Sequence, residues 1–312
     1  MAFDGFLMAA LTKELSDRLT GGHLQKISQP EQDELILAVK NNRQTWRLVL
    51  SASPSLPLIY LTDKSKTAPL TAPNFCMLLR KHLSGARICR IYQHELERVI
   101  FIEFENRNEL GDLVHRNLVI EIMGKHSNII FLDEENKIVD SIRHVSALVS
   151  SVREVLPGRT YFIPNTREKH NPFELTTELW MTELTKQPVS IAKGLCNYLT
   201  GFSFSMAQEV AYRCHLDGDD PFASCNGNQL STLLSCLRAL MEHVKNGNFE
   251  PEIVFHNGEP VEFSAFEMKR YEAEGYEHRP FESVSRMIEV FYGEKEMIQR
   301  IRQKSADLRK NV

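Results

Sequence analysis

The 312-residue sequence lacks the features of a secreted, membrane-bound or disulfide-linked protein. Its six cysteines include no pair at Cys-x-x-Cys spacing, which is typical of zinc and redox sites. We therefore expect reduced, mostly buried thiols, with no disulfide framework and no metal site. The N-terminus has no basic residue before Lys13, and charged residues soon break its apolar run, which fits neither a signal peptide nor a membrane span. These absences predict a cytoplasmic protein without a membrane partner.

Basic residues are concentrated in the first half of the chain, although the whole chain has a net charge of −4. Residues 1–170 hold 22 Lys and Arg against 20 Asp and Glu, a net charge of +2, which leaves −6 for the remainder. The stretch 64–90 contains no acidic residue. Its basic residues are Lys64, Lys66, Arg80, Lys81, Arg87 and Arg90. On composition alone this stretch favours a solvated helix face with a basic loop, and a phosphate-binding surface is the alternative.

Turn residues divide the first 170 residues into short strands and two helices. Apolar residues at helical spacing predict a helix over 5–18 with Asp4 at its N-cap, and Pro73 begins a second helix that runs to Leu83. Short apolar runs between turn residues predict antiparallel strands. The predicted strands are 23–28, 34–40, 45–51, 57–62, 87–93, 97–104, 114–123, 127–132 and 137–143. This pattern predicts an antiparallel β-sandwich with flanking helices.

Proline and glycine interrupt regular structure three times between residues 157 and 172, which predicts a domain boundary near residue 173. From 174 to 250 the pattern is helical. Gly201 separates two predicted helices, and the box Ser205–Gln208 is expected to cap the second. This arrangement resembles a helix-hairpin-helix, whose turn amides can face a nucleic-acid backbone, and also an αα-hairpin that binds nothing.

The remaining residues form two further segments. Residues 251–281 contain short strand-like runs that we expect to pack back onto the first domain, 1–173. Apolar residues at spacings of three and four among many charges predict the start of a coiled coil over 282–312. Because this pattern continues to the last residue, we expect a longer protein.

The segment 121–128 places charged and amide side chains at the end of an apolar strand. In a regular strand, Ile120 and Ile122 point to one face, so Glu121 and Met123 are expected on the opposite face. Gly124 allows a turn, and polar residues follow it before the next apolar run. The segment therefore predicts a hairpin with a polar tip.

Six short motifs, in this order and spacing, resemble the N-terminal half of NFACT proteins of the RqcH type. These ribosome quality-control factors often carry the name fibronectin-binding protein. The motifs are Phe3-Asp4-Gly5, Gln29-Pro30, Leu79-Arg80-Lys81-His82-Leu83, Glu97-Arg98, Glu121–Asn128, and Val155-Leu156-Pro157-Gly158 followed by Tyr161. The resemblance implies an α+β NFACT-N domain over 1–173, a small all-helical helix-hairpin-helix-like domain over 174–250, and a coiled coil that starts in 282–312. The family usually has Asp where this chain has Glu97, so the carboxylate reaches further.

The resemblance implies an RNA-binding adaptor rather than an enzyme. Such a protein binds a large (50S) ribosomal subunit obstructed by peptidyl-tRNA and positions alanyl-tRNA. The ribosome then adds C-terminal alanines to the stalled chain without mRNA. The adaptor supplies binding energy and orientation and needs no cofactor. Its expected partners are the large subunit and alanine tRNA, with no DNA and no membrane.

The family's tRNA contacts carry over to eight positions of this chain. They are Asp4, Glu97, Arg98, Glu121, Ile122, Met123, Lys125 and His126. Further RNA-backbone contacts are expected at Arg80, Lys81, Arg87, Arg90 and Gly201. Simpler interpretations exist, because Asp4 also suits a helix cap and the pair Glu97-Arg98 also suits a surface ion pair.

Strand geometry and ligand spacing limit the roles of three of these positions, Glu97, Arg98 and His126. Adjacent residues of a regular strand point to opposite faces, so Glu97 and Arg98 reach one ligand only at a strand end or a bulge. His126 has no second metal ligand at suitable spacing in its turn. We therefore expect His126 to contact a phosphate or ribose, rather than to act in catalysis.

Two other classes of protein share parts of this pattern. The layout also resembles DNA glycosylases of the formamidopyrimidine type, but these need an N-terminal Pro nucleophile, and this chain begins Met1-Ala2-Phe3 without a zinc-finger spacing. At most a glycosylase-like nucleic-acid-binding domain without catalysis is expected. The name fibronectin-binding suggests a surface adhesin, which the lack of a signal peptide and of a disulfide framework makes the less favoured interpretation.

Overall fold

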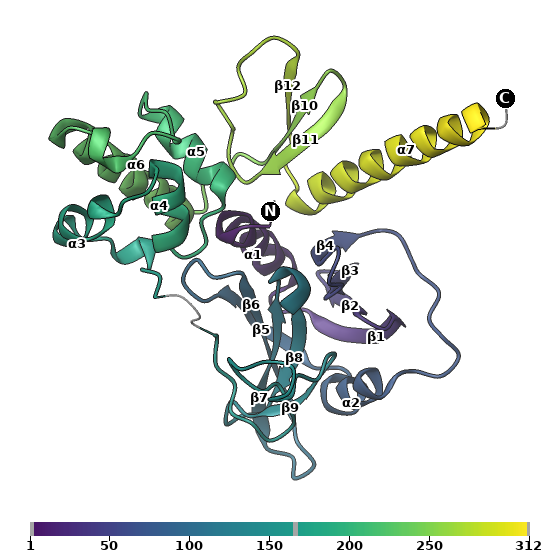
Figure 1. Cartoon of the computed structure of the whole chain (residues 1–312). Coiled ribbons are helices and arrows are strands. Elements are labelled where there is room, and N and C mark those ends of the chain that lie inside the picture. Colours follow the sequence, from purple (N-terminus) through teal and green to yellow (C-terminus); the bar gives the residue numbers. More distant parts are fainter. Residues whose placement is uncertain (1–2, 165–167, 311–312) are drawn as a thin grey trace. The chain divides into compact units, whose positions relative to one another are not determined.

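A computed structural model of the chain, drawn in Figure 1, describes residues 3–164 and 168–310. The chain divides into two compact units. We call Phe3–Thr176 together with Cys196–Phe202 the sheet unit. We call Thr177–Leu195 together with the residues from Ser203 onward the helical unit. The boundaries predicted near residues 173, 250 and 282 stay predictions.

The sheet unit contains a nine-stranded antiparallel sheet with the strand order β4-β3-β2-β1-β5-β6-β7-β8-β9. Its strands are β1 (His23–Glu31), β2 (Glu34–Asn41), β3 (Gln44–Ser51), β4 (Leu58–Thr62), β5 (Arg87–Gln93), β6 (Val99–Arg107), β7 (Leu113–Glu121), β8 (Asn128–Leu132) and β9 (Ile138–Ser141). The meanders β1–β4 and β5–β9 join at the pair His23 and Arg87, and backbone hydrogen bonds flank this pair on both sides. The predicted large antiparallel sheet is confirmed, although hydrogen bonding gives one continuous sheet where the sequence suggested the two sheets of a sandwich.

Helix α1 (Gly5–Leu19) is enclosed at its N-terminal end. It begins where the sequence predicts, because the Asp4 carboxylate accepts a hydrogen bond from the Leu7 N–H at 2.9 Å. All seven residues from Gly5 to Leu11 are buried, and a helix that is apolar on every side must be surrounded by protein. It packs on β2, β5 and β6, whereas α2 (Asn74–Leu83) packs on β1. The enclosure fixes the position of Asp4.

A hydrophobic cluster covers one face of the second meander. The irregular segment 142–164, which we call the covering segment, closes over it through bridges from Val145 to Val155 and from Lys137 to Thr160. The buried members of the cluster are Val99, Phe101, Val119, Ile130, Leu132, Ile138, Val155 and Tyr161. Because the opposite face is buried as well, all five residues of β8 are buried. Alternation therefore does not separate buried from exposed side chains here.

The helical unit combines helices of different lengths with a second, three-stranded sheet in the order β11-β10-β12. Its elements are α3 (Thr177–Thr182), α4 (Ile191–Tyr198), α5 (Phe204–Arg213), α6 (Gly227–Lys245), β10 (Glu252–His256), β11 (Glu259–Ser264), β12 (Tyr276–Pro280) and α7 (Val284–Lys310). The last residues of α4 belong to the sheet unit. Short 3-10 helices occur at Gly124–His126, Pro172–Glu174, Leu184–Lys186 and Phe222–Ser224. The expected packing of 251–281 on the first domain stays a prediction.

The connection from α4 to α5 has the expected order of helix, glycine turn and capped helix. Gly201 has a positive φ of 83° in the turn. The cap itself is Ser203, whose hydroxyl accepts from the Met206 N–H at 3.1 Å, and the prediction of a cap at Ser205 is wrong. Ser205 lies inside α5 and donates its hydroxyl to Glu262 instead. The likeness of this connection to a helix-hairpin-helix stays a prediction.

Helix α7 changes character along its length. Val284, Met287 and Phe291 are buried, whereas Met297 and Ile301 are more than half exposed. This change leaves an apolar stripe open on the later turns, and the coiled coil, whose last two residues lie outside the described residues, stays a prediction. Among the described residues, no helix combines the length and the apolar character needed to cross a membrane.

His278 in β12 links the protonation of the helical unit to its stability. Its Nδ1 lies 2.8 Å from the Glu252 carboxylate, and its Nε2 lies 2.8 Å from the Tyr271 carbonyl oxygen. Both partners accept hydrogen bonds, so only the doubly protonated ring satisfies both. Burial lowers the pKa of His278, but the two hydrogen bonds and the charge of Glu252 outweigh it, and the net shift is upward.

We expect the stabilisation from His278 to be present in full below its unfolded pKa of about 6.5, and to be lost as the pH rises through the higher folded pKa. The free energy of unfolding of wild type relative to His278→Gln should therefore fall as the pH rises above about 6.5 and through the folded pKa. Urea unfolding at several pH values measures this difference. A difference that does not change with pH would contradict the assignment.

Candidate nucleic-acid interface

Glu97 and Arg98 lie in the turn between β5 and β6, ahead of the first residue of β6, Val99. The predicted strand start at residue 97 is therefore wrong by two residues. The Glu97 N–H donates to the His94 carbonyl at 3.0 Å, and the Gln93 side chain donates to the Glu97 carbonyl at 2.8 Å. Because the pair stands outside a strand, the alternation of strand side chains does not separate Glu97 from Arg98.

The turn 94–98 packs directly on two glycines. A Cβ atom added to Gly5 or to Gly201 would lie 2.1 Å from the Leu96 carbonyl oxygen. The Gly5 N–H donates to the Gly201 carbonyl at 2.8 Å, and the Gln93 side chain donates to the Gly5 carbonyl at 2.9 Å. This contact brings together four of the predicted positions: Asp4, Glu97, Arg98 and Gly201.

We predict that Gly201→Ala destabilises the protein more than Gly158→Ala. The two glycines have similar φ values, 83° and 85°, but an added Cβ atom at Gly158 would meet nothing within 4 Å. Both variants place alanine in a left-handed backbone conformation, which is strained. Only Gly201→Ala also clashes with Leu96. We expect a further loss of about 1–3 kcal/mol in the free energy of unfolding. If urea unfolding shows equal losses of unfolding free energy for the two variants, the close approach of Leu96 to Gly201 does not contribute to stability.

The second loop is the tip of the β7–β8 hairpin, residues 122–127. Its 3-10 helix begins at Gly124, whose φ is 58°. The Ser127 hydroxyl accepts from the Met123 N–H at 2.9 Å and donates to the Gly124 carbonyl at 2.7 Å. Lys125 and His126 are exposed, and Met123 is half-buried. The predicted hairpin with a polar tip is confirmed.

Arg143 positions this tip, and the sequence analysis did not single it out. Its guanidinium donates to the carbonyls of Lys125 and Ala52, each at 3.0 Å, and pairs with Asp33 at 3.4 Å. The Asn128 side chain donates in turn to the Arg143 carbonyl at 2.9 Å. The only sequence signal is its place at the end of the predicted strand 137–143, and its partners come from distant parts of the chain. We regard Arg143 as a positioning residue.

The turn 94–98 and the hairpin tip lie side by side, because the Ile122 N–H donates to the Arg98 carbonyl at 3.0 Å. Burial lowers the pKa of Arg98, while the nearby charges of Glu97 and Asp4 act in the opposite direction. Burial, and then the charge of Glu95, raise the pKa of Glu97. The charges here are partly withdrawn from water, so they act more strongly on an approaching charged group than fully exposed ones.

Glu121 and Ile122 are fully buried, which corrects the expectation that Glu121 stands on an open face. The Glu121 carboxylate forms an ion pair with Arg153 and accepts from the Tyr161 hydroxyl at 2.8 Å. Burial lowers the pKa of Arg153, but the carboxylate raises it more, and the net shift is upward. Burial and the same carboxylate raise the pKa of Tyr161. A direct contact of either side chain with RNA conflicts with this burial, so we assign them to holding the hairpin.

We expect Glu121→Ala to lower the free energy of unfolding by about 3–5 kcal/mol, because it leaves the Arg153 guanidinium buried without a counter-charge. The matched change Lys125→Ala, at an exposed position of the same hairpin, should cost less than about 0.5 kcal/mol. Chemical denaturation measures both variants. If the Glu121→Ala protein is as stable as wild type, the structural role of Glu121 is wrong, and Glu121 is again a candidate for RNA contact.

The four basic residues predicted to contact the RNA backbone have partners within the protein. Arg80 donates to the Ile27 carbonyl at 2.9 Å, and Arg90 stacks on the Tyr92 ring at 4.0 Å. The other two form ion pairs: Lys81 with Glu109 at 3.8 Å and Arg87 with Glu105 at 3.6 Å. The acidic partners come from β6 and the loop after it. They reduce the positive potential that the acid-free stretch 64–90 suggested, and the RNA contacts there stay a prediction.

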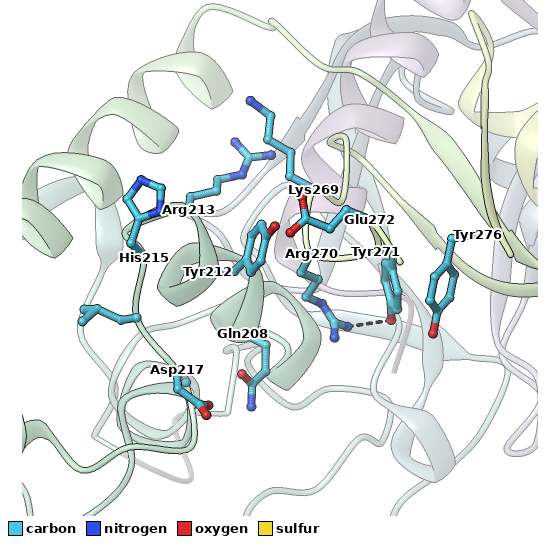
Figure 2. Close-up of a pocket in the computed structure, with 12 residues that line it drawn as sticks. Gln208, Tyr212, Arg213, His215, Asp217, Lys269, Arg270, Tyr271, Glu272 and Tyr276 are labelled. Carbon is cyan, nitrogen blue, oxygen red and sulfur yellow. Dashed lines mark hydrogen bonds between the residues drawn. The ribbon is translucent and has the colours of Figure 1, made fainter. Parts of the chain in front are cut away.

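The helical unit contains a cavity of about 980 Å³, shown in Figure 2. Its lining includes Tyr212, Tyr271 and Tyr276, but none of the thirteen predicted site residues. Two of its cations are already paired, Arg213 with Glu209 at 3.1 Å and Arg270 with Glu262 at 3.3 Å. Nucleic acids are bound over open surfaces as well as in concave pockets, so the cavity does not displace the loops as the candidate interface.

These loops stand on an antiparallel sheet that is followed by helices, and comparison with known proteins identifies the family. The chain belongs to the NFACT family. Its residues 4–312 match the family described as NFACT N-terminal and middle domains. The protein named Rqc2 homolog RqcH from Bacillus subtilis is 34% identical over 313 residues, which cover 100% of this chain and 52% of the relative. The chain thus spans about half the length of the curated relatives it matches.

Two solved structures support the fold. The N-terminal part of the fibronectin/fibrinogen-binding protein from Streptococcus suis is 31% identical, with a TM-score of 0.74 over 93% of this chain and 99% of that chain. The fibrinogen-binding protein from Staphylococcus aureus is 30% identical, with a TM-score of 0.75 over 94% of this chain and 99% of that chain. The resemblance drawn from the six sequence motifs is confirmed.

Proposed function

We propose that this chain is the N-terminal part of a ribosome quality-control adaptor, and that its paired loops bind tRNA. Membership of the NFACT family and the names of the RqcH relatives support this role. On this proposal the whole protein binds obstructed large (50S) subunits that carry peptidyl-tRNA, in the cytoplasm, and recruits alanyl-tRNA. The ribosome then adds C-terminal alanines to the stalled chain without mRNA.

The observation that carries the proposal is the meeting of two loops from separate motifs. The Ile122 N–H donates to the Arg98 carbonyl at 3.0 Å, which sets the turn 94–98 beside the hairpin tip. Asp4 is held next to them by the contact of Gly5 with Leu96. Residues as far apart in the chain as Asp4 and His126 thus belong to one small region.

The half-buried Glu97 and Arg98 and the exposed Lys125 and His126 each have a role that suits RNA. The Arg98 guanidinium provides directed donors for a phosphate, and Lys125 provides a flexible cation at the hairpin tip. His126 is exposed at the tip and can donate to a phosphate or a ribose hydroxyl. The Glu97 carboxylate can accept from a base amino group or a ribose hydroxyl, which contributes selectivity rather than affinity.

We propose that the protein acts without catalysis of its own. The region combines ion-pairing groups with backbone hydrogen bonds, and two of its carboxylates support the fold: Asp4 caps α1, and Glu121 is buried against Arg153. Binding energy that orients the amino acid on a tRNA is sufficient, because the ribosome supplies the chemistry of peptide-bond formation.

The test is recovery of RNA with the tagged protein from cells, for wild type and for Arg98→Ala. We expect wild type to enrich alanine tRNA together with large-subunit rRNA. Loss of a charged hydrogen-bond donor costs about 1.5–3 kcal/mol, so Arg98→Ala should lose tRNA about tenfold to a hundredfold. The rRNA should remain, because other parts of the whole protein contribute to subunit binding on this proposal.

Two matched variants separate contact from fold. Arg98→Lys keeps the charge beside Asp4 and Glu97 but removes the planar donor set, and should recover part of the tRNA binding. Arg107→Ala removes an exposed arginine at the far end of β6 and should leave tRNA binding unchanged. If Arg98→Ala and Arg107→Ala recover the same RNA as wild type, the assignment of tRNA to this region is wrong.

A second candidate function rests on the structural relatives named for fibronectin and fibrinogen binding. On that alternative, the chain would belong to a surface adhesin that binds extracellular matrix proteins. Labelling of intact cells with a reagent that does not cross the membrane distinguishes the two. Labelling of most of the protein would favour the adhesin, whereas labelling no stronger than that of a ribosomal protein would favour the adaptor.

A further inference from the structure

A β-bulge in β5 turns a cysteine toward the outer face of the sheet. The pairing of β5 with β6 shifts register between Ile88 and Arg90, so Cys89 is the additional residue. Ile88 and Ile91 are both buried, and the two residues between them therefore point outward. Without the bulge, alternation would place one of them in the core.

The Cys89 thiol meets two other ligand groups there, one from each of the next two strands. The His115 Nδ1 lies 3.7 Å from the Cys89 Sγ and 3.0 Å from the Glu103 carboxylate. One ligand atom from each of the three residues lies within 4.8 Å of the other two. Zinc bonds of about 2.0–2.3 Å in a tetrahedron separate neighbouring ligand atoms by roughly 3.3–3.8 Å. The cluster is therefore close to the size that a bound ion requires.

The other ring nitrogen of the histidine also has a suitable partner. The His115 Nε2 lies 3.5 Å from the Glu105 carboxylate. A metal-binding histidine commonly donates its second N–H to a carboxylate, which fixes the tautomer and makes the ligating nitrogen more basic. Glu105 would hold His115 with Nδ1 free of a proton and directed at Cys89 and Glu103.

We propose that Cys89, Glu103 and His115 form a binding site for a divalent transition metal, with Glu105 as the positioning residue for His115. Thiolate sulfur with imidazole nitrogen favours zinc over magnesium or calcium, which prefer oxygen ligands. Binding releases the thiol proton of Cys89 to solvent, and the charges of the thiolate and of Glu103 balance those of the ion. Three protein ligands leave the fourth position to water or to an external ligand.

This site could not be read from the sequence. Its ligands are 14 and 12 residues apart on three strands, with no Cys-x-x-Cys or His-x-x-x-His spacing. The expectation of no metal rested on that spacing alone. Antiparallel pairing with one bulge supplies the proximity that a short motif supplies in a zinc finger.

The test uses cobalt(II) as an optical probe of the metal-free chain. Tetrahedral cobalt(II) bound to a thiolate gives visible absorption and a thiolate-to-cobalt charge-transfer band in the near ultraviolet. We expect both at one equivalent, with displacement by zinc(II). Cys89→Ser should abolish the charge-transfer band. Glu105→Gln should keep the band but weaken binding about tenfold to a hundredfold.

Cys236→Ser is the matched control, because Cys236 and Cys214 lie close enough to share a hydrogen bond and could bind cobalt on their own. This variant should leave the spectrum unchanged. The four side chains of the proposed site are at least partly exposed, so their variants should keep the circular dichroism spectrum of wild type. Absence of the charge-transfer band in wild type, or its persistence in Cys89→Ser, overturns the proposal.

Discussion

The candidate interface depends on one backbone contact, the approach of the Leu96 carbonyl to Gly5 and Gly201. A side chain at either glycine would bring a carbon to 2.1 Å from the carbonyl oxygen, which no packed structure tolerates. Neither partner can easily move away, because Gly5 opens a helix whose first seven residues are all buried. The contact thus fixes the turn that carries Glu97 and Arg98 against the buried start of α1.

The hairpin tip has an independent support. Burial of the Glu121 carboxylate is costly, and the Arg153 ion pair and the Tyr161 hydroxyl offset that cost. These partners belong to the covering segment, so the strand end is fixed from the outside, while Arg143 fixes the tip through the Lys125 carbonyl. Two loops with separate supports meet at one hydrogen bond, from Ile122 to Arg98. An adaptor benefits from this arrangement, because groups that are ordered before binding lose little entropy when RNA arrives.

Sequence reasoning predicted those parts of the fold that local chemistry determines. The Asp4 cap, the helix before Gly85 and the strands of both meanders follow from turn residues and apolar runs. It failed for Glu121 because a period of two shows which side chains share a face, but not what covers that face. The covering segment has no periodicity, and only three-dimensional packing places Arg153 and Tyr161 on the carboxylate. The cap at Ser203 was missed for a smaller reason, the choice between two nearby serines.

The surface charge of the sheet could not be predicted from a linear stretch of sequence either. Strands β5 and β6 show the reason. Residues 64–90 contain no acid, yet sheet pairing places Glu103 opposite Arg90 and Glu105 opposite Arg87. The outer face of β5 and β6 is therefore nearly balanced in charge, which does not favour phosphate. A divalent ion held by Cys89 and Glu103 would cancel the carboxylate that faces Arg90, and would engage Glu105 through His115.

Metal binding would in this way shift the face toward positive charge without touching the turn 94–98 or the hairpin tip. Cys89 precedes the end of β5 by four residues, and the turn begins beyond that end, so roughly 13 Å of strand separates the two places. At that distance the electrostatic influence of one ion is largely screened at physiological salt. Any effect of the metal on RNA binding should therefore arise at the basic residues of β5, Arg87 and Arg90, and leave the contribution of Arg98 as it is.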